Sequence, residues 1–341
     1  MLELDGSFGE GGGQILRTSL ALSLLTGKPF HLRNVRAGRA KPGLQPQHLM
    51  SVRAAATIGS AQVRGASLSS TDLVFEPGPV TAGRYRFDVG TAGATGLVLH
   101  TLYLPLALRG DAPSELILIG GTHVKASPCF HFLDLTWRRY LEAFGLRLSL
   151  TMFRPGFYPR GGGVVEVHIQ PCAGLRGAMS PSRGSVTRAT GFSAAAGLPE
   201  SVAQRQARRA AYRLRQRGLK VELREEMWEG GPGSVLAVAL DTAPAPTLFF
   251  GLGARGKPSE RVADEAVDQV IAFLDADDAP VDPHSADQIV LPLALADGPS
   301  EYRVAQVTCH LTTNIAVIRC FLERDIVCEG DEGGFGWVRI A

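Results

Sequence analysis

The chain has 341 residues, a formal net charge of +2 and 45% hydrophobic residues, a composition typical of a globular protein with one large domain or two smaller ones. Charged or glycine residues interrupt every apolar run before it reaches the length of a membrane span, so we expect no membrane partner. The five cysteines are an odd number without a CxxC pair, which argues against a disulfide framework or a zinc site and for a reducing, cytoplasmic location.

A glycine-rich segment at residues 9–17 opens the first predicted helix. Four of its first five residues are glycine, the exception is Glu10, and Leu16, Leu20 and Leu24 follow at helical spacing. A ligand can approach a backbone without Cβ atoms, and the N–H groups of the helix start favour an anion, while Glu10 can serve a cation. A flexible turn is the alternative, and we favour a phosphate or nucleotide site.

Helices alternate with short strands three times along the chain. Each copy follows the pattern helix–strand–helix–strand, at residues 14–64, 93–152 and 286–329. Further strands fit around these copies, at residues 2–4, 73–75, 85–89, 164–169 and 336–340. The pattern predicts an internally repeated α/β fold of the α+β type.

A long segment, residues 183–275, separates the third copy from the second. Loop-like stretches flank it, one rich in Ser, Pro and Gly and the other rich in Asp and Pro. Its own pattern has strands at residues 185–192, 220–225 and 235–241, and helices at residues 202–217 and 259–274. We therefore expect a small α/β domain at 183–275, inserted into a larger domain formed by residues 1–182 and 276–341.

The predicted helix at 202–217 carries six arginines between Arg205 and Arg217. Such a helix could contact RNA, but a solvated charged face is the more common explanation of a basic helix. We favour the charged face.

Arg36, Arg39 and Gln47 follow shortly after the glycine-rich segment, in a loop and at the start of the next helix. Arginine forks bind phosphate through two hydrogen bonds, so this segment is a second candidate for a phosphate site. Surface arginines in an ordinary loop are the alternative. Two later loops are weaker candidates: residues 120–128 offer hydroxyls and a cation to an oxyanion, and residues 158–163 hold a second triglycine, for which we favour tight packing.

His310 is predicted to open an apolar helix directly after a strand. The helix dipole favours the neutral form of a histidine at this position, which keeps a ring nitrogen free for nucleophilic attack or metal binding. A structural histidine is the alternative. Upstream, residues 284–288 open another helix with a carboxylate and an amide that could orient a cation or a ribose.

Together these segments resemble the RNA 3′-terminal phosphate cyclase family over nearly the whole chain. Residues 9–17, 36–48, 120–122, 156–163, 285–294 and 309–316 occur in the family's order and spacing. The resemblance implies three βαβαββ repeats, with a smaller α/β domain inserted before the third repeat.

The resemblance also implies a three-step reaction that uses ATP and a divalent cation, Mg²⁺ or Mn²⁺. The ring of His310 takes AMP from ATP, AMP passes to the 3′-phosphate of an RNA, and the adjacent 2′-OH displaces it to leave a 2′,3′-cyclic phosphate. The other matching residues are Glu10 near the metal, then Arg17, Arg36, Arg39 and Gln47 on the phosphate and nucleotide side, and then His284, Ser285, Ala286, Asp287 and Gln288, of which Asp287 and Gln288 are the nucleotide-contacting pair. The physiological RNA and the oligomeric state stay open.

His100 departs from the bacterial members of the family, which carry glutamine at this position against the nucleotide. We expect His100 to face bound adenosine, so that ATP use weakens as the ring is protonated below about pH 6.5. Packing of His100 between helices is the alternative. His123 and Lys125 also differ from many relatives, which bears on how the RNA end is held.

Two other classes of protein remain in view. A non-catalytic RNA-binding paralogue lacks the nucleophilic histidine, so His310 argues against it. An enolpyruvyl-transferase-like enzyme shares the repeated βαβαββ architecture, but it needs no histidine nucleophile and does not explain the arginines of residues 36–48.

Overall fold

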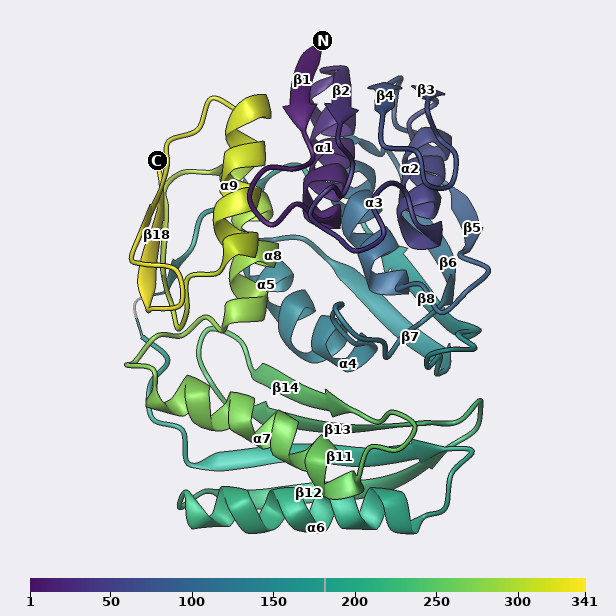
Figure 1. Cartoon of the computed structure of the whole chain (residues 1–341). Coiled ribbons are helices and arrows are strands. Elements are labelled where there is room, and N and C mark those ends of the chain that lie inside the picture. Colours follow the sequence, from purple (N-terminus) through teal and green to yellow (C-terminus); the bar gives the residue numbers. More distant parts are fainter. Residues whose placement is uncertain (181) are drawn as a thin grey trace.

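The computed structural model describes residues 1–180 and 182–341, and it contains three units whose four-stranded sheets share the same strand order (Figure 1). The first unit has the order β1-β2-β4-β3, with β1 and β2 parallel and the other pairs antiparallel. Its elements are β1 (Leu2–Asp5), α1 (Gly13–Thr26), β2 (Phe30–Arg33), α2 (Pro46–Ile58), β3 (Gln62–Arg64) and β4 (Leu73–Glu76).

The second unit repeats this order as β5-β6-β8-β7, again with its first two strands parallel. Its elements are β5 (Arg84–Asp88), α3 (Thr95–Arg109), β6 (Ser114–Gly120), β7 (Leu148–Arg154) and β8 (Gly163–Ile169), with a helical segment before β7. That segment consists of α4 (Phe130–Phe132), a π-helical turn η1 (Leu133–Trp137) and α5 (Arg138–Ala143).

The third unit has the order β10-β16-β18-β17, so the predicted α/β class is confirmed. Its elements are β10 (Met179–Ser180), α8 (Pro283–Ala294), β16 (Ser300–Val304), α9 (Cys309–Phe321), β17 (Ile326–Glu329) and β18 (Gly336–Ile340). Its first strand, β10, precedes the inserted segment in sequence. The insertion therefore lies inside the third unit, between its first strand and first helix, and not before the unit as expected. A separate strand pair joins β9 (Leu175–Arg176) to β15 (Ala296–Asp297).

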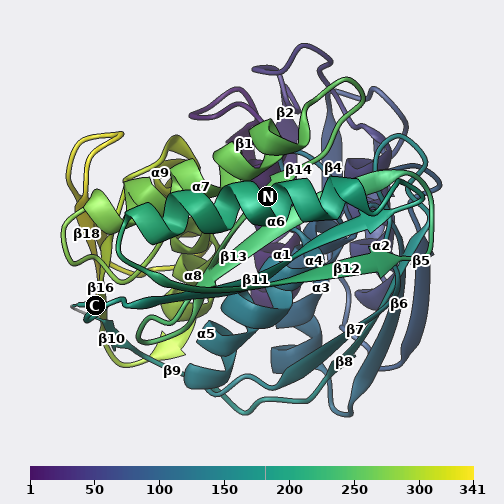
Figure 2. The same ribbon diagram turned by 90° about the horizontal axis from the view of Figure 1, so that it is seen from below.

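The inserted segment forms its own four-stranded sheet below the three units in Figure 1, with the order β12-β11-β13-β14. Its elements are β11 (Arg188–Ala196), α6 (Ser201–Gln216), β12 (Lys220–Trp228), β13 (Gly233–Leu240), β14 (Thr247–Leu252) and α7 (Ser259–Asp275). Seen from below, α6 and α7 lie over one face of this sheet (Figure 2).

The two faces of this sheet belong to different hydrophobic cores. Leu236 and Val238 pack with residues of α6 and α7. Val235 and Ala237, which alternate with them along β13, pack in the core of the three units. On the neighbouring strand β14, the amide of Leu248 donates a hydrogen bond at 3.0 Å to Thr136 Oγ1 in the second unit. The inserted segment is thus packed onto the larger part of the protein through a full sheet face.

The arginines of α6 face a row of carboxylates on α7. The ion pairs are Arg205–Glu260, Arg209–Asp264, Arg213–Asp268 and Arg217–Asp275. Because α7 neutralises these charges within the protein, the helix is better described as a paired charged face than as an RNA contact. Across the described ranges, no helix is long and apolar enough to cross a membrane.

Candidate active site

The glycine-rich loop between β1 and α1 is packed against two other parts of the chain. Gly9 and Gly11 have φ values of +56° and +54°, a conformation that favours glycine. A Cβ atom on Gly9 would lie 2.1 Å from Thr313 Oγ1, and one on Gly11 would lie 2.9 Å from the Cα of Gly38. The loop is therefore wedged between α9 and the arginine-containing loop, which excludes the interpretation as a flexible turn.

Glu10 lies where these segments meet, and its side chain is only 5% exposed. Its Oε2 pairs with Arg39 and lies 3.4 Å from Nδ1 of His310. Its Oε1 accepts a hydrogen bond from the amide of Gln14 at 3.2 Å, and its own amide donates to Thr313 Oγ1 at 3.1 Å. The fold thus brings together the carboxylate, the arginine and the histidine that the sequence singled out from opposite ends of the chain.

His310 lies in the first turn of α9, as predicted. Thr308 is the N-cap of this helix, and its Oγ1 accepts a hydrogen bond from the amide of Leu311 at 3.2 Å. The cap fixes the start of the helix, and the side chain of His310 is left 51% exposed. The ring is therefore held by its helix and remains accessible to a ligand.

The environment of His310 favours its neutral ring. Partial burial lowers the pKa of His310, and the charges of Arg17 and Arg39 act in the same direction. The carboxylate of Glu10 opposes this shift. With Nδ1 directed at that carboxylate, the favoured tautomer carries its proton on Nδ1 and leaves the lone pair on Nε2. A neutral, half-exposed imidazole of this kind is able to act as a nucleophile.

Arg17 and Arg39 are the arginines best placed to bind an anion beside His310. Burial lowers the pKa of Arg17 to about 10, and its Nε is buried without a partner among the residues described. Arg39 pairs with Glu10 but keeps 43% of its side chain exposed. Arg36, by contrast, uses Nη1 to hold its own loop, donating to the carbonyls of Lys41 at 2.7 Å and Gly43 at 2.8 Å.

Gln47 links the first unit to the second. Its Oε1 accepts a hydrogen bond at 2.9 Å from the amide of Ala94, the N-cap residue of α3. The adjacent His48 lies against the glycine loop, since its Nε2 would be 2.5 Å from a Cβ on Gly13. Burial lowers the pKa of His48 to about 3, so this ring is neutral. The structure thus gives Gln47 a positioning contact in addition to its expected role at the nucleotide.

Residues 284–288 form the first turn of α8, and only part of this turn faces a possible ligand. The carboxylate of Asp282 caps the helix, accepting from the amide of His284 at 2.8 Å and from the hydroxyl of Ser285 at 2.5 Å. Ser285 is 1% exposed and Ala286 is fully buried. The expected nucleotide contact of Ser285 and Ala286 therefore finds no support, because their side chains are enclosed by the helix cap and the core.

The remaining residues of this turn stay candidates for nucleotide contact. Burial raises the pKa of Asp287 to about 7, against the opposing charge of Arg17. The Oε1 of Gln288 is buried without a hydrogen-bond partner in the described structure, while its Nε2 donates to the carbonyl of His284 at 2.6 Å. A carboxyl near its midpoint and an unused amide oxygen are groups that a ribose hydroxyl can satisfy.

A cleft of about 270 Å³ opens between these helix starts and the inserted segment. Its apolar lining comes from Phe249, Ala272, Phe273, Ala276 and Ala305, and its polar lining from Gln269, His284, Asp287, Gln306, Thr308 and His310. An apolar wall with a few polar groups is typical of a site for a small organic ligand. The sequence analysis did not place the inserted segment at this cleft: it predicted the helix that carries Gln269, Ala272 and Phe273 but not its position beside α8, and it did not predict the strand β14 that carries Phe249.

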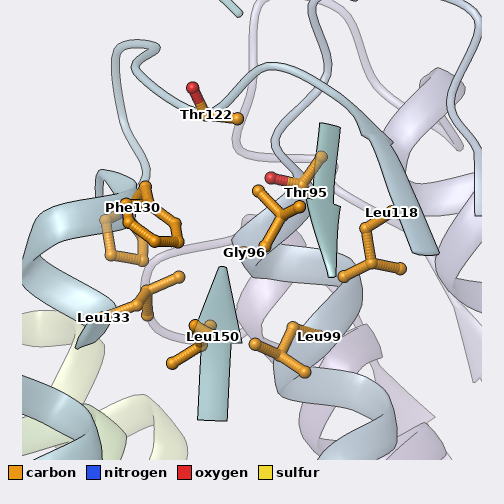
Figure 3. Close-up of a pocket in the computed structure, with 10 residues that line it drawn as sticks. Thr95, Gly96, Leu99, Leu118, Thr122, Phe130, Leu133 and Leu150 are labelled. Atoms are coloured by element: carbon orange, nitrogen blue, oxygen red, sulfur yellow. The ribbon is translucent and has the colours of Figure 1, made fainter. Parts of the chain in front are cut away.

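A second pocket is too small to be a ligand site. Figure 3 shows it between α3, β6 and the turn at Phe130, lined mainly by apolar side chains such as Leu99, Leu118 and Leu133. Its volume is about 10 Å³, which is no more than the space for one water molecule.

His100 lies on α3 and packs against Trp137 and Tyr103, with ring centroids 5.1 and 6.3 Å apart. Burial lowers the pKa of His100 to about 3, and the charge of Arg17 adds to the shift. The expectation that this ring is protonated near pH 6.5 is therefore wrong. Its Nε2 is buried without a partner in the part of the chain that the structure covers, so a contact with the nucleotide stays a prediction.

Glu10 fits the single carboxylate expected near a divalent cation. The residues described hold no group of three or more His, Cys, Asp or Glu side chains that would bind a metal unaided. Mg²⁺ is commonly held by one or two carboxylates together with substrate phosphates, so Glu10 meets this requirement only in the presence of a phosphorylated substrate.

Comparison with known proteins points to one family. The family model described as "RNA 3'-terminal phosphate cyclase" matches residues 8–328. A protein of that name from Pyrobaculum aerophilum is 43% identical over 324 residues, covering 94% of this chain and 92% of its own length. Proteins of the same name from Ralstonia nicotianae and Salmonella typhimurium are 43% and 41% identical, covering 97% and 98% of this chain and 94% and 97% of their own lengths. The chain belongs to the RNA 3′-terminal phosphate cyclase family.

Proposed function

We propose that the protein uses ATP to convert the 3′-terminal phosphate of an RNA into a 2′,3′-cyclic phosphate. Membership of the family supports the overall reaction. The observation that carries the mechanism is the position of His310: a neutral ring at the cleft, 3.4 Å from the carboxylate of Glu10 and close to two arginines.

In the first step, Nε2 of His310 attacks the α-phosphorus of ATP. A P–N bond forms, the P–O bond to the β-phosphate breaks, and pyrophosphate leaves. Glu10 keeps the ring proton on Nδ1, while Arg17 and Arg39 stabilise the negative charge of the transition state. The nucleoside occupies the cleft against Phe249, with its ribose near Asp287 and Gln288.

In the second step, an oxygen of the RNA 3′-phosphate attacks the phosphorus of the bound AMP, and the P–N bond breaks. The 2′-OH of the terminal ribose then attacks the 3′-phosphorus, loses its proton and displaces AMP. Adenylylation is needed because a phosphate dianion has no good leaving group, and covalent catalysis divides one difficult displacement into easier ones. A divalent cation bound by Glu10 and the triphosphate would screen the phosphate charges.

The rival readings fit this site less well. A non-catalytic RNA-binding protein needs neither a histidine with a lowered pKa nor a carboxylate directed at its ring. An enolpyruvyl-transferase-like enzyme accounts for the repeated units but leaves the Glu10–His310 pair without a role.

The test is transfer of label from ATP that is radiolabelled at the α-phosphate. The unchanged protein should acquire an acid-labile, base-stable label, and RNA with a 3′-phosphate should gain a phosphatase-resistant end. His310→Asn should lose both activities and stay folded, since the ring is half exposed. His168→Asn, at an exposed histidine on β8, is the matched control and should keep both. Protein-bound AMP in His310→Asn would contradict the assignment.

A further inference from the structure

Phe8 is an exposed aromatic residue in the loop that carries Glu10. Phe8 is 55% exposed to solvent. The ring belongs to none of the hydrophobic clusters and pairs with no other aromatic ring in the described structure. Core packing therefore does not explain a phenylalanine at this position.

The backbone holds Phe8 in a fixed place. Its amide donates to the carbonyl of Asp5 at 3.3 Å, and its carbonyl accepts from the amide of Gly11 at 3.0 Å. The next residue, Gly9, is packed against Thr313. An aromatic ring presented on an ordered turn loses little conformational freedom when it binds a ligand.

The turn that carries Phe8 is packed against the helix of the proposed nucleophile, His310. Thr313 lies three residues after His310 in α9, so the two residues share a face of the helix. Gly9, the residue that follows Phe8, packs against Thr313. On the other side of the turn, the carbonyl of Gly11 accepts a hydrogen bond from the amide of Gly38 at 3.1 Å, so the turn also contacts the loop that carries Arg39. The turn that presents the exposed ring is thus packed between the helix of His310 and the cationic loop.

We propose that Phe8 stacks on the nucleobase of the RNA's 3′-terminal nucleotide. Aromatic rings beside cationic side chains are the usual means of binding single-stranded RNA ends, because every base has a π face. The terminal base and the 3′-phosphate are attached to the same ribose, so a ring that holds the base also orients the phosphate toward His310. The inference rests on the proposed function and extends it to recognition of the RNA end without strong base preference.

The experiment compares two RNAs that both carry a 3′-phosphate, one with a normal terminal nucleotide and one with an abasic terminal nucleotide. Phe8→Ala should raise the KM for the normal RNA about tenfold and leave that for the abasic RNA unchanged. Phe8→Trp should retain the KM of the unchanged protein. Phe153→Ala, at another exposed phenylalanine (65%) on β7, is the matched control and should change neither value.

A second readout separates this inference from the proposed function. Phe8→Ala should form the protein–AMP adduct from labelled ATP at the normal rate, since the RNA base takes no part in that step. Equal losses on both RNAs, or no loss on either, would overturn the stacking role while the proposed function stands. The proposed function fails instead if the unchanged protein forms no adduct.

Discussion

The backbone amide of Glu10 donates a hydrogen bond to the side-chain hydroxyl of Thr313 at 3.1 Å, joining the first unit of the fold to the third. This contact fixes the turn from which the Glu10 carboxylate reaches the ring of His310. Because Thr313 is 1% exposed, no water can replace its hydroxyl if it is lost.

Thr313→Val should therefore reduce both stability and adenylylation. Valine keeps the shape of threonine but leaves the amide of Glu10 without an acceptor, which costs about 1–3 kcal/mol of unfolding free energy. Urea unfolding and the rate of protein labelling by ATP measure the two effects. Thr312→Val is the control, because within the described residues the exposed hydroxyl of Thr312 donates only to carbonyls at the start of its own helix. Equal effects of the two substitutions would show that the contact across units has no special role.

Glu10→Gln and Arg39→Gln should each slow adenylylation far more than they lower the melting temperature. In the proposed mechanism Glu10 orients the ring of His310 and helps to bind the cation, while Arg39 stabilises the phosphate charge, and the loss of one such group slows a reaction by about 10²-fold or more. Arg39 is 43% exposed but Glu10 is only 5% exposed, so Arg39→Gln also costs some stability because it leaves a buried carboxylate without its ion-pair partner. Arg64→Gln, in an exposed pair with Glu76, is the control for charge removal. A melting temperature below that of the assay would favour a structural role for both residues.

His100→Gln should weaken the dependence of stability on pH. Burial lowers the pKa of His100 to about 3 in the folded protein, whereas a free histidine has a pKa of about 6.5. As the pH falls below 6.5 the unfolded chain gains a proton that the folded protein does not, so the unfolding free energy falls by about 1.4 kcal/mol per pH unit for this residue. Glutamine removes this contribution.

Urea unfolding between about pH 6 and pH 4 measures the slope. His48→Gln should reduce it similarly, because burial lowers the pKa of His48 to about 3 as well. An unchanged slope in His100→Gln would mean that the ring is protonated in the folded protein. Because the pKa of His100 is about 3, we also expect that protonation of His100 causes no change in ATP affinity near pH 6.5.

Ala272→Phe should weaken ATP binding without unfolding the protein. Ala272 lies on α7, is exposed and lines the cleft, so a large ring at this position fills the space proposed for the nucleoside. We expect a rise in the KM for ATP of about tenfold, which is roughly 1.4 kcal/mol, and an unchanged urea midpoint. Ala272→Ser adds one oxygen only and is the control. Normal ATP use by Ala272→Phe would place the nucleoside elsewhere.

Much of the fold could be predicted because its local patterns are strong. Each unit alternates apolar helices with short strands, and the glycine loop and the His310 helix start both lie where their residue types placed them. The elements of the inserted segment lie within the predicted bounds, but the first strand of the third unit was missed because β10 has only two residues, and no periodicity exists in so short a strand. The strand β14 was missed because its apolar run is short and follows a proline-containing turn.

The site was less predictable, because a sequence does not show which side chains lie next to one another in the folded protein. The arginines of α6 are visible in the chain, but their pairing with carboxylates on α7 depends on how the two helices pack. Ser285 and Ala286 match a family segment, yet the hydroxyl of Ser285 donates to the Asp282 cap of α8 and Ala286 is buried in the core. The cleft needed the inserted segment and α8 side by side, a relationship that no local pattern contains.

The strand order of the third sheet also bears on how the protein is made. β18 ends the chain in sequence but lies between β16 and β17 in the sheet that supports α9. During synthesis β16 and β17 therefore emerge before the strand that joins them, although the glycine loop emerged first. Among the described strands β17 pairs with β18 alone, so we expect this sheet to be the last of the three to close.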